Sequence, residues 1–393
     1  MIWEKVTLGE LYTVHNGLSK ESKFFGSGYP FLSFSTVFNN YFIPDELVDL
    51  VQSDEKEQKN YSISRGDVFV TRTSETLDEL GMSCVALKDY PRATYNGFTK
   101  RMRPIATDRV HPEYIGYYMR MPSFRREFRA FSTMTTRASL KNEDLLSLTI
   151  LLPSMEQQIR IAEVLQTYDK LIENNKQQIK LLEEAAQRLY KEWFVDLHFP
   201  GYEDVDIGED VPEGWKKERL VDIANVQYGY AFDGSQFNDS GNGMPIIRIR
   251  NILFGNTSDY TTEDADAKYI ISNGEILVGM DGEFHINSWS GNNAYLVQRS
   301  CCLRPKKKEM NGWLLWAINE PIKYYEKTVV GATVSHLGKK HIDAIELLTG
   351  PKELYIPFQK YFDMRQHLLN QNWLLAEARN RLLPKLMSGE IEV

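Results

Sequence analysis

The sequence predicts an α+β protein in which two mixed α/β modules are separated by two long helices that form an antiparallel coiled coil, arranged as a pseudo-two-fold internal repeat. One observation is a heptad pattern of apolar residues in 161–193 that returns near the C-terminus. A second is a residue match between these stretches, LEEAAQRL at 182–189 against LAEARNRL at 375–382. A third is that a globular segment precedes each helix, and these segments also match in order.

The globular segments share three short patterns. Trp3 and Trp215 begin the same series of spaced apolar residues, which ends at a glycine. The run PFLSFS at 30–35 and the run PIIRIR at 245–250 both alternate like half-buried strands. The run YSISRGDVFV at 61–70 matches YIISNGEILV at 269–278, where a glycine-containing turn leads into an apolar strand. The offset in residue number between matched positions of the two copies decreases towards the C-terminus, so the second copy has shorter loops. Loops are where a repeated scaffold varies.

These patterns divide the chain into four regions. Residues 1–152 form the first module and residues 153–198 the first helical region, which Pro153 opens. Residues 199–350 form the second module, with an acidic linker at 196–213, and residues 351–393 form the second helical region. A length of 393 residues agrees with two or three domains.

The helical regions favour a coiled coil over helices that each lie on one globular core, because the 4-3 spacing continues for more than four heptads. A 40-residue helix is about 60 Å long, so the pair would set the spacing between the modules. Internal duplication supplies the partner helix within the chain, and a parallel dimer of two chains is the alternative. Asn175 interrupts the apolar frame and is expected to fix its register. The predicted seam contains Leu165, Tyr168, Ile172, Asn175, Ile179, Leu182, Leu189, Trp193, Leu368, Leu375, Leu382 and Leu386.

The C-terminal helix is apolar on two faces. Its heptad frame carries Arg365, Asn372 and Arg379, and a second apolar stripe runs beside it. We expect one face to contact the partner helix and the other to be available to another protein. The second stripe contains Phe362, Leu369, Trp373, Ala376 and Leu383.

Charge is distributed unevenly along the chain, although the net charge is −8. Residues 92–141 hold eleven Lys/Arg against three Asp/Glu, and residues 298–341 hold nine against three. The two basic blocks occupy corresponding halves of the repeat. An ordinary solvated surface is the alternative, but the recurrence favours a phosphate backbone bound at two places.

Cysteine content and hydropathy favour a cytoplasmic location. The three cysteines, Cys84, Cys301 and Cys302, lack metal-ligand spacing to each other or to histidine, which is typical of a reducing compartment. No apolar run approaches the roughly 18 residues that a membrane helix needs, and the N-terminus has no signal-peptide pattern.

Catalytic motifs are absent from the sequence, apart from one loose match. There is no phosphate-binding loop, no glycine-rich cofactor loop after a strand and no His-Glu-x-x-His. Asp45, Asp54 and Lys56 fit a nuclease pattern in which carboxylates hold Mg²⁺. This pattern often arises by chance and has no counterpart in the second half. A Mg²⁺-dependent nuclease is therefore an alternative hypothesis, and no catalytic or metal-ligating residue is expected.

Hydroxyl, amide and cationic residues recur at matched places and suit contacts to phosphates and base edges. Each one alone is also typical of a surface loop. In the first half the candidates are Thr71, Arg72, Thr73, Ser74, Asn96, Lys100, Arg101, Arg137, Ser139 and Lys141. In the second half they are Arg248, Arg250, Asp281, His285, Gln298, Arg299, Thr333, Ser335, His336, Lys339 and Lys340.

With these residues the chain resembles the specificity subunit of type I restriction–modification systems. The resemblance covers the whole chain and is strongest in the helices. It rests on GDVFVTRTSE at 66–75, GATVSHLGKK at 331–340, LPSMEQQ at 152–158 and RNRLLPKLMSGEIEV at 379–393. One departure is YIPFQ at 355–359, which stands where the first copy has EQQ.

The resemblance implies a non-catalytic subunit with two target recognition domains, each of which binds one half of a split, asymmetric DNA sequence. It also implies that the helices set the gap between half-sites and dock two modification subunits, which methylate adenine with S-adenosylmethionine. ATP-dependent restriction subunits would complete the assembly, so S-adenosylmethionine, ATP and Mg²⁺ belong to partners and no cofactor is expected in this chain. A coiled-coil scaffold that does not bind DNA is the remaining alternative.

Overall fold

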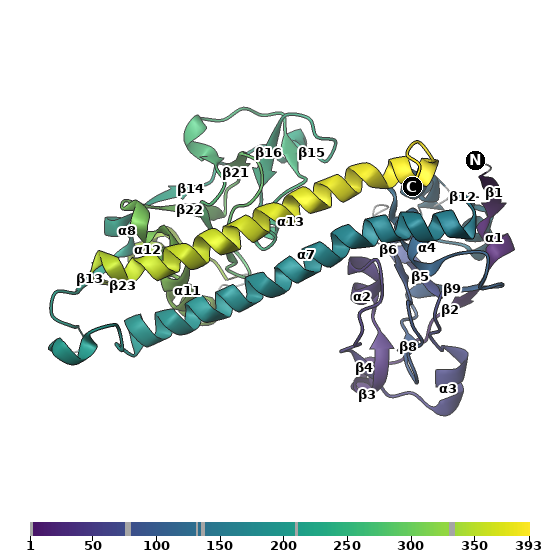
Figure 1. Ribbon diagram of the computed structural model, residues 1–393, viewed down its shortest axis with the longest axis horizontal. Helices are drawn as coiled ribbons and strands as arrows, with labels where there is room; N and C mark the ends of the chain where they lie inside the picture. Colours follow the sequence, from purple (N-terminus) through teal and green to yellow (C-terminus); the bar gives the residue numbers. More distant parts are fainter. Residues whose placement is uncertain (1–2, 75–79, 131–132, 135–137, 209–210, 330–334) are drawn as a thin grey trace. The chain divides into compact units, whose positions relative to one another are not determined.

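A computed structural model describes residues 3–74, 80–130, 133–134, 138–208, 211–329 and 335–393 (Figure 1). Contacts divide the chain into two compact units, residues 1–169 with 377–393 and residues 170–376. Each unit therefore contains one globular module, part of the first long helix and part of the second. The predicted helical regions at 153–198 and 351–393 each contribute residues to both units.

The first unit is built on an antiparallel sheet. Its strand order is β2-β9-β5-β7, with β9 (Thr99–Pro104) and β5 (Val68–Thr71) at the centre. A capping box between Thr7 and Glu10 starts the short helix α1, which leads into β2. Most of the remaining elements are β1 (Glu4–Thr7), α1 (Leu8–Leu11), β2 (Tyr12–Asn16), β3 (Phe25–Leu32), α2 (Phe34–Asn39), β4 (Leu50–Val51), α3 (Glu55–Asn60), β6 (Thr73–Ser74), β7 (Ser83–Val85), β8 (Thr94–Tyr95), α4 (Pro112–Arg120), α5 (Pro122–Ala130), β11 (Ala138–Ser139), α6 (Asn142–Ser147) and β12 (Thr149–Leu152).

The second unit repeats this architecture. Its main sheet has the order β14-β22-β19-β20, with β22 (Ser300–Pro305) and β19 (Ile276–Gly279) at the centre. β13 pairs with β23 as β1 pairs with β12, which confirms the repeat. Its other elements include β13 (Lys216–Arg219), α8 (Leu220–Ile223), β14 (Ala224–Tyr228), β15 (Phe237–Asn238), β16 (Met244–Ile247), α9 (Ile249–Ile252), β17 (Tyr260–Thr261), β18 (Ile270–Ile271), β20 (Ile286–Ser288), β21 (Ala294–Leu296), α10 (Asn311–Ala317), α11 (Asn319–Thr328), α12 (Lys339–Asp343) and β23 (Glu346–Thr349).

The same ion pair supports the central strands of both modules. In the first module Arg103 donates to both carboxylate oxygens of Asp67, at 2.7 and 2.6 Å, and Asp67 is fully buried. In the second module Arg304 pairs with Glu275 in the same position. The aspartate and glutamate follow the matched glycines, Gly66 and Gly274, both of which have positive φ angles. The turn before the buried strand is thus conserved in shape as well as in sequence.

The long helices are α7 (Met155–Tyr190) and α13 (Ile356–Ser388), coloured teal and yellow in Figure 1. α7 continues into a π-helical turn, Lys191–Val195. Every residue of the predicted seam is buried or half-buried. Trp193 lies in the π-helical turn that continues α7, where it meets Phe358 of α13 edge-on at 6.0 Å between ring centroids.

Within each unit the two helices run antiparallel in the same chain. In the second unit Asn175 Nδ2 donates to Gln371 Oε1 at 3.3 Å, and Glu183 accepts from Arg365 Nε at 2.6 Å. Later residues of α7 thus contact earlier residues of α13, which is the antiparallel arrangement. In the first unit Asp169 forms an ion pair with Arg379. These contacts confirm the predicted antiparallel pair, and Asn175 is buried with a partner on the opposite helix, as expected for a register-fixing residue.

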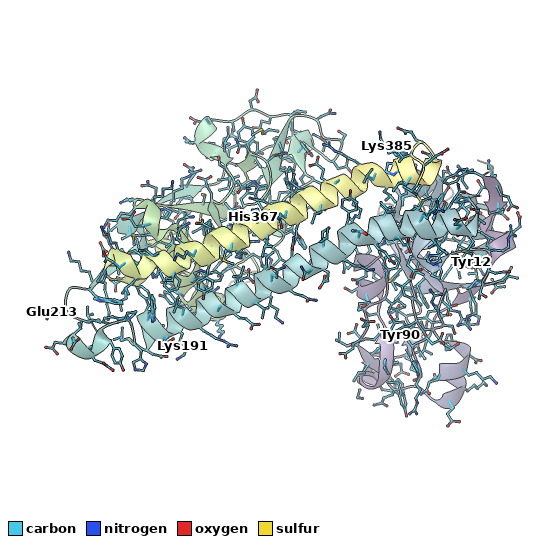
Figure 2. All side chains as sticks on the ribbon, viewed as in Figure 1. Tyr12, Tyr90, Lys191, Glu213, His367 and Lys385 are labelled. Atoms are coloured by element: carbon cyan, nitrogen blue, oxygen red, sulfur yellow. The ribbon has the colours of Figure 1, made fainter. Side chains whose placement is uncertain are left out.

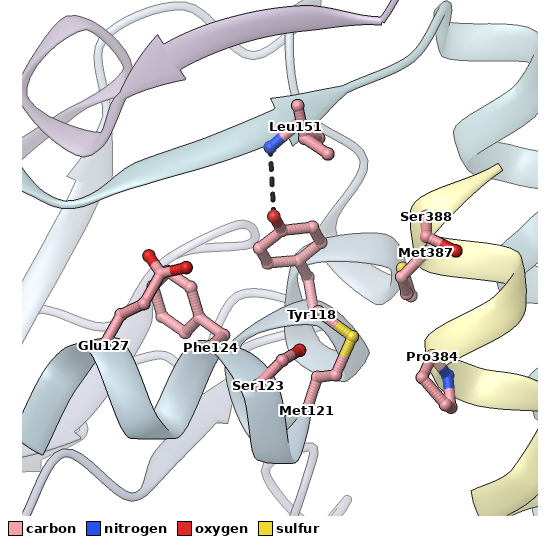
Figure 3. A pocket seen from close by; sticks show the side chains of 9 residues that line it. All are labelled: Tyr118, Met121, Ser123, Phe124, Glu127, Leu151, Pro384, Met387 and Ser388. Atoms are coloured by element: carbon pink, nitrogen blue, oxygen red, sulfur yellow. Dashed lines mark hydrogen bonds between the residues drawn. The ribbon is translucent and has the colours of Figure 1, made fainter.

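Two residues of the second apolar stripe of α13 pack on the chain's own modules and so are not available to another protein, contrary to the expectation. Phe362 lies in the core of the second unit and Leu383 in the core of the first. Each helix therefore buries one face against its partner helix and another against globular cores. A surface pocket of about 190 Å³ remains beside this packing in the first unit (Figure 3). Its lining residues include Tyr118 and Met121 of the α4–α5 region, and Pro384 and Met387 of α13.

Arg365, one of the polar residues on the α13 frame, has structural partners in the second module. Arg365 is buried and donates to Asn287 Oδ1 and Ser288 Oγ, both at 2.7 Å, as well as to Glu183. Gln366 donates to the carbonyl oxygen of Trp289 at 2.6 Å. Arg365 therefore joins three elements, α7, α13 and β20, which explains why this helix departs from a purely apolar frame.

The two long helices begin with an equivalent contact. Gln158 Oε1 accepts from the backbone N–H of His111 at 2.8 Å, just before α4. Gln359 Oε1 accepts from the backbone N–H of Gly312 at 3.0 Å, in α10. The run YIPFQ at 355–359 therefore keeps the glutamine that accepts this backbone hydrogen bond at the helix start, although its other residues differ.

Side chains of both units are shown in Figure 2, where Tyr12 and Tyr90 mark the interior of the first module.

Candidate nucleic-acid interface

In each module three chain segments meet where a central strand ends. In the first module the backbone N–H of Arg72 donates to Phe98 O at 2.9 Å, and Leu140 N–H donates to Arg72 O at 3.0 Å. In the second module Met280 N–H donates to Arg299 O at 2.8 Å, and Leu337 N–H donates to Met280 O at 2.7 Å. We call this place the strand-end corner of each module. The equivalent hydrogen bonds show that both copies hold the same backbone there.

The corner of the first module presents an arginine and an aromatic ring. Arg72 follows β5 and is half-buried, and its Nε atom has no hydrogen-bond partner among the described residues. Phe98 is 55% exposed at the tip of the turn before β9. Asn96 Oδ1 accepts from the Phe98 N–H at 2.7 Å and so shapes that turn. The predicted residues Arg72 and Asn96 therefore lie together, and exposed Phe98 joins them.

Thr71 is not exposed in this corner. It is the last residue of β5, is fully buried, and its hydroxyl accepts from the backbone N–H of Met82 at 2.9 Å. The sequence predicts Thr71 as a contact because its hydroxyl stands at the end of the strand that precedes Arg72. A strand alternates its side chains, however, and here the threonine faces the interior. Its position therefore fits a role in strand packing better than a direct contact.

Lys100 and Arg101 are also buried, because β9 is a central strand. The Lys100 ammonium donates to Asn142, and burial together with the nearby Arg72 charge lowers the pKa of Lys100. The Arg101 guanidinium stacks over the Tyr95 ring at 5.4 Å and donates to Ser62 O at 2.6 Å. Neither residue is placed as the exposed contact that the sequence suggested.

The corner of the second module brings together three predicted residues. Asp281 follows β19, Arg299 lies in the turn before β22, and His336 precedes α12. Asp281 Oδ2 lies 3.5 Å from Arg299 Nε, and its other oxygen is hydrogen-bonded to His336 Nδ1. The side chains of Arg299 and His336 are 55% and 46% exposed. Residues far apart in the sequence thus form one exposed polar cluster.

The other predicted residues of the second module lie outside this cluster or at its border. Arg250 is exposed, but Asp259 binds both its Nε and its Nη2 atoms. Arg248 stacks over the Phe237 ring at 5.6 Å. The Ser335 carbonyl accepts from the Gly282 N–H at 3.1 Å and closes the corner. Exposed or half-exposed positions with no assigned role are Lys141 in the first module and His285, Gln298, Lys339 and Lys340 in the second.

Arg137 and Thr333 lie outside the described residues. Thr73, Ser74 and Ser139 lie on the short strands β6 and β11, whose register pairs Thr73 with Ser139. This pairing occupies the place of the Asp281–His336 bridge in the second module.

The nuclease hypothesis finds no support in the positions of its residues. Asp54 is the N-cap of α3, where its carboxylate accepts from the Glu57 N–H at 2.8 Å. Asp45 is 95% exposed and pairs with Lys88 at 3.0 Å. Across the part of the chain that the structure describes, no group of three or more His, Cys, Asp or Glu residues is arranged to hold a metal ion. Asp54 is therefore explained by helix capping.

No helix within the described ranges has both the length and the apolarity that a membrane span requires.

Comparisons with known proteins identify both modules. The family model described as "Type I restriction modification DNA specificity domain" matches residues 2–184 and again residues 212–354. The type I restriction enzyme MjaIX specificity subunit of Methanocaldococcus jannaschii is 28% identical over 334 residues, which cover 79% of this chain and 75% of the relative. The HindI specificity subunit of Haemophilus influenzae is 23% identical over 99% of both chains.

A solved structure shares the fold over nearly the whole length. The type I restriction-modification system S subunit from M. genitalium aligns with a TM-score of 0.52 and 16% identity, covering 98% of this chain and 96% of that chain. The two family matches together span most of the chain, and each contains one of the two globular modules. The chain therefore belongs to the type I restriction modification DNA specificity family and carries two specificity domains.

Proposed function

We propose that this chain is the non-catalytic subunit that selects the DNA target of a type I restriction–modification complex, and that each module binds one half of a split, asymmetric sequence. The observation that carries this proposal is the pair of strand-end corners. Both are held by the same backbone hydrogen bonds, yet the first presents Arg72 and Phe98 while the second presents Asp281, Arg299 and His336. A shared frame with different side chains is what two modules need to bind different base sequences.

The long helices would hold the modules at a fixed separation and would supply the docking surface for two modification subunits. In this assembly the modification subunits bring S-adenosylmethionine and methylate adenine, and the restriction subunits bring ATP-dependent activity. This chain then needs no cofactor of its own. Exposed apolar side chains on α7 and α13 support a role of these helices in protein contacts, and they include Leu171, Leu181, Met364 and Leu374.

DNA binding should fall steeply with salt and with loss of Arg72. Displaced counterions make binding through phosphates salt-dependent, and the Arg72→Ala change removes the half-buried guanidinium that the first corner presents. We expect a loss of affinity of about 1–3 kcal/mol for a duplex with the target sequence. The measurement is a gel-shift titration of the full chain, with its modification subunits, at several salt concentrations.

Arg109→Ala is the matched control for this titration. Arg109 belongs to the same basic block of the sequence, but it pairs with Glu4 at 3.2 Å, beside β1. Its replacement should leave the affinity nearly unchanged. Binding that does not depend on salt, or equal losses in the two variants, would contradict the proposed interface.

A further inference from the structure

Arg299 has an unusual backbone conformation in the corner of the second module. Its φ angle is +70°, in the left-handed region that bulky side chains rarely adopt. The turn is held from both sides, because Met280 N–H donates to Arg299 O at 2.8 Å and Gln298 N–H donates to Tyr230 O at 2.7 Å. Strained positions of this kind persist where the surrounding structure fixes them, and they concentrate at functional sites.

Asp281 holds the Arg299 side chain without using all of its donors. The carboxylate lies 3.5 Å from Nε, and His336 Nδ1 lies 3.5 Å from Nη1. Other arginines of this module differ in this respect. Asp259 binds the Nε and Nη2 atoms of Arg250, and Asp222 binds the same two atoms of Arg219. Arg299 is thus held by long contacts from two different residues and stays 55% exposed, whereas in each of the other two arginines a single carboxylate binds two guanidinium nitrogens.

We propose that Arg299 is a specificity-determining residue that binds guanine in the half-site of the second module, with Asp281 and His336 as positioning residues. The proposal rests on the proposed DNA-binding function and adds the base class to it. The two terminal nitrogens of an arginine match O6 and N7 of guanine in the major groove. An aspartate beside the arginine also suits a neighbouring cytosine, whose amino group donates to carboxylates.

Charge favours a base over a phosphate as the ligand of this cluster. The Asp281 carboxylate offsets the Arg299 charge, so the pair has little net attraction for a phosphate. A carboxylate near the DNA backbone is also repelled by it. What the pair gains is a fixed orientation of the guanidinium, and orientation matters for hydrogen bonds to base edges more than for phosphate attraction.

The first module lacks this arrangement at the equivalent backbone positions. Phe98 takes the place of Arg299, and Arg72 takes the place of Met280. The guanine contact should therefore affect only one of the two half-sites. This asymmetry gives the experiment an internal control, because the half-site of the first module reports that the protein is folded and bound.

The test is selection from a duplex DNA library with the full chain and its modification subunits. The library contains two randomised blocks at a series of separations, and bound molecules are sequenced. The wild-type protein should select two blocks, one of which contains a guanine that depends on Arg299. With Arg299→Ala, the preference at this single position should fall about 10- to 100-fold, while the other block stays unchanged.

Three further variants separate base contact from charge and from structure. Arg299→Lys keeps the charge but lacks the guanidinium fork, so it should lose the same preference. Asp281→Asn should lower the preference several-fold at the same position, because the guanidinium is held less firmly. Arg219→Ala removes an equally exposed arginine, 58% against 55%, whose fork is occupied by Asp222, and it should change nothing.

A modified base provides a second measurement that needs no variant. Replacing the dependent guanine by 7-deazaguanine removes the N7 acceptor and should weaken wild-type binding, but not binding of Arg299→Ala. The inference is overturned if the selected block of the second module contains no such guanine, if Arg299→Lys retains the preference, or if Arg299→Ala weakens all sequences equally. Failure of the wild-type protein to select any sequence would instead refute the DNA-binding function itself.

Discussion

Replacing Arg365 by alanine should destabilise the second unit by about 3 kcal/mol or more. Arg365 is only 6% exposed and donates to Glu183, Asn287 and Ser288, of which the last two are themselves buried. The variant leaves the Asn287 and Ser288 oxygens without their donor in an interior that water does not reach, and the cost of unpaired buried polar groups exceeds the net value of the bonds that are lost. We therefore expect a large decrease in the free energy of unfolding.

Tryptophan fluorescence during denaturant unfolding is suited to this measurement. Six of the seven tryptophans lie in residues 170–376, so the signal reports mainly on the second unit. Arg188→Ala is the control within the same unit, because Arg188 forms an exposed ion pair with Glu184 one turn away on α7. It should change the free energy of unfolding by about 0.5 kcal/mol or less. Equal effects of the two substitutions would contradict the role assigned to Arg365.

Inserting one heptad into each long helix should change the gap between the half-sites without changing their sequences. A suitable place is after Ile172 in α7 and after Leu375 in α13, between the Asp169–Arg379 ion pair and the Asn175–Gln371 hydrogen bond. Seven residues add about 10 Å to a helix. At 3.4 Å per base pair, the preferred gap should grow by about three base pairs.

The control for the heptad insertion is seven residues inserted after Asp206. This residue lies in the exposed acidic linker, where additional chain is easily accommodated. The linker variant should keep the original gap, as measured by binding to duplexes that differ only in spacer length. A gap that stays the same in the helix variant, or half-site sequences that change with it, would show that the helices do not set the separation.

The repeated scaffold could be predicted from the sequence because its signals are periodic and local. The heptad frame through Leu165 and Leu382 predicted the helix pair, and the matched turns at Gly66 and Gly274 predicted corresponding central strands. Asn175 was identified as a polar residue inside an apolar frame, and its partner Gln371 lies on the other helix. Patterns of this kind depend on neighbouring residues and the period of one element.

The candidate interface was predicted less completely, because burial depends on the position of a strand within its sheet. Lys100 and Arg101 carry charges that suggest a surface, but the strand that contains them is central. Conversely, the cluster of Asp281, Arg299 and His336 forms from three separate segments. Its members were predicted individually, but nothing in their spacing indicated that they would meet.

The most direct test of the two-module account is methylome sequencing of cells that carry this chain with its partner subunits. We expect one methylated motif made of two defined and different blocks, separated by a gap of constant length without base preference. Deletion of the gene for this chain should remove that motif. A single uninterrupted motif, or two identical blocks in a palindrome, would contradict the conclusion that the two modules bind different halves of one DNA target.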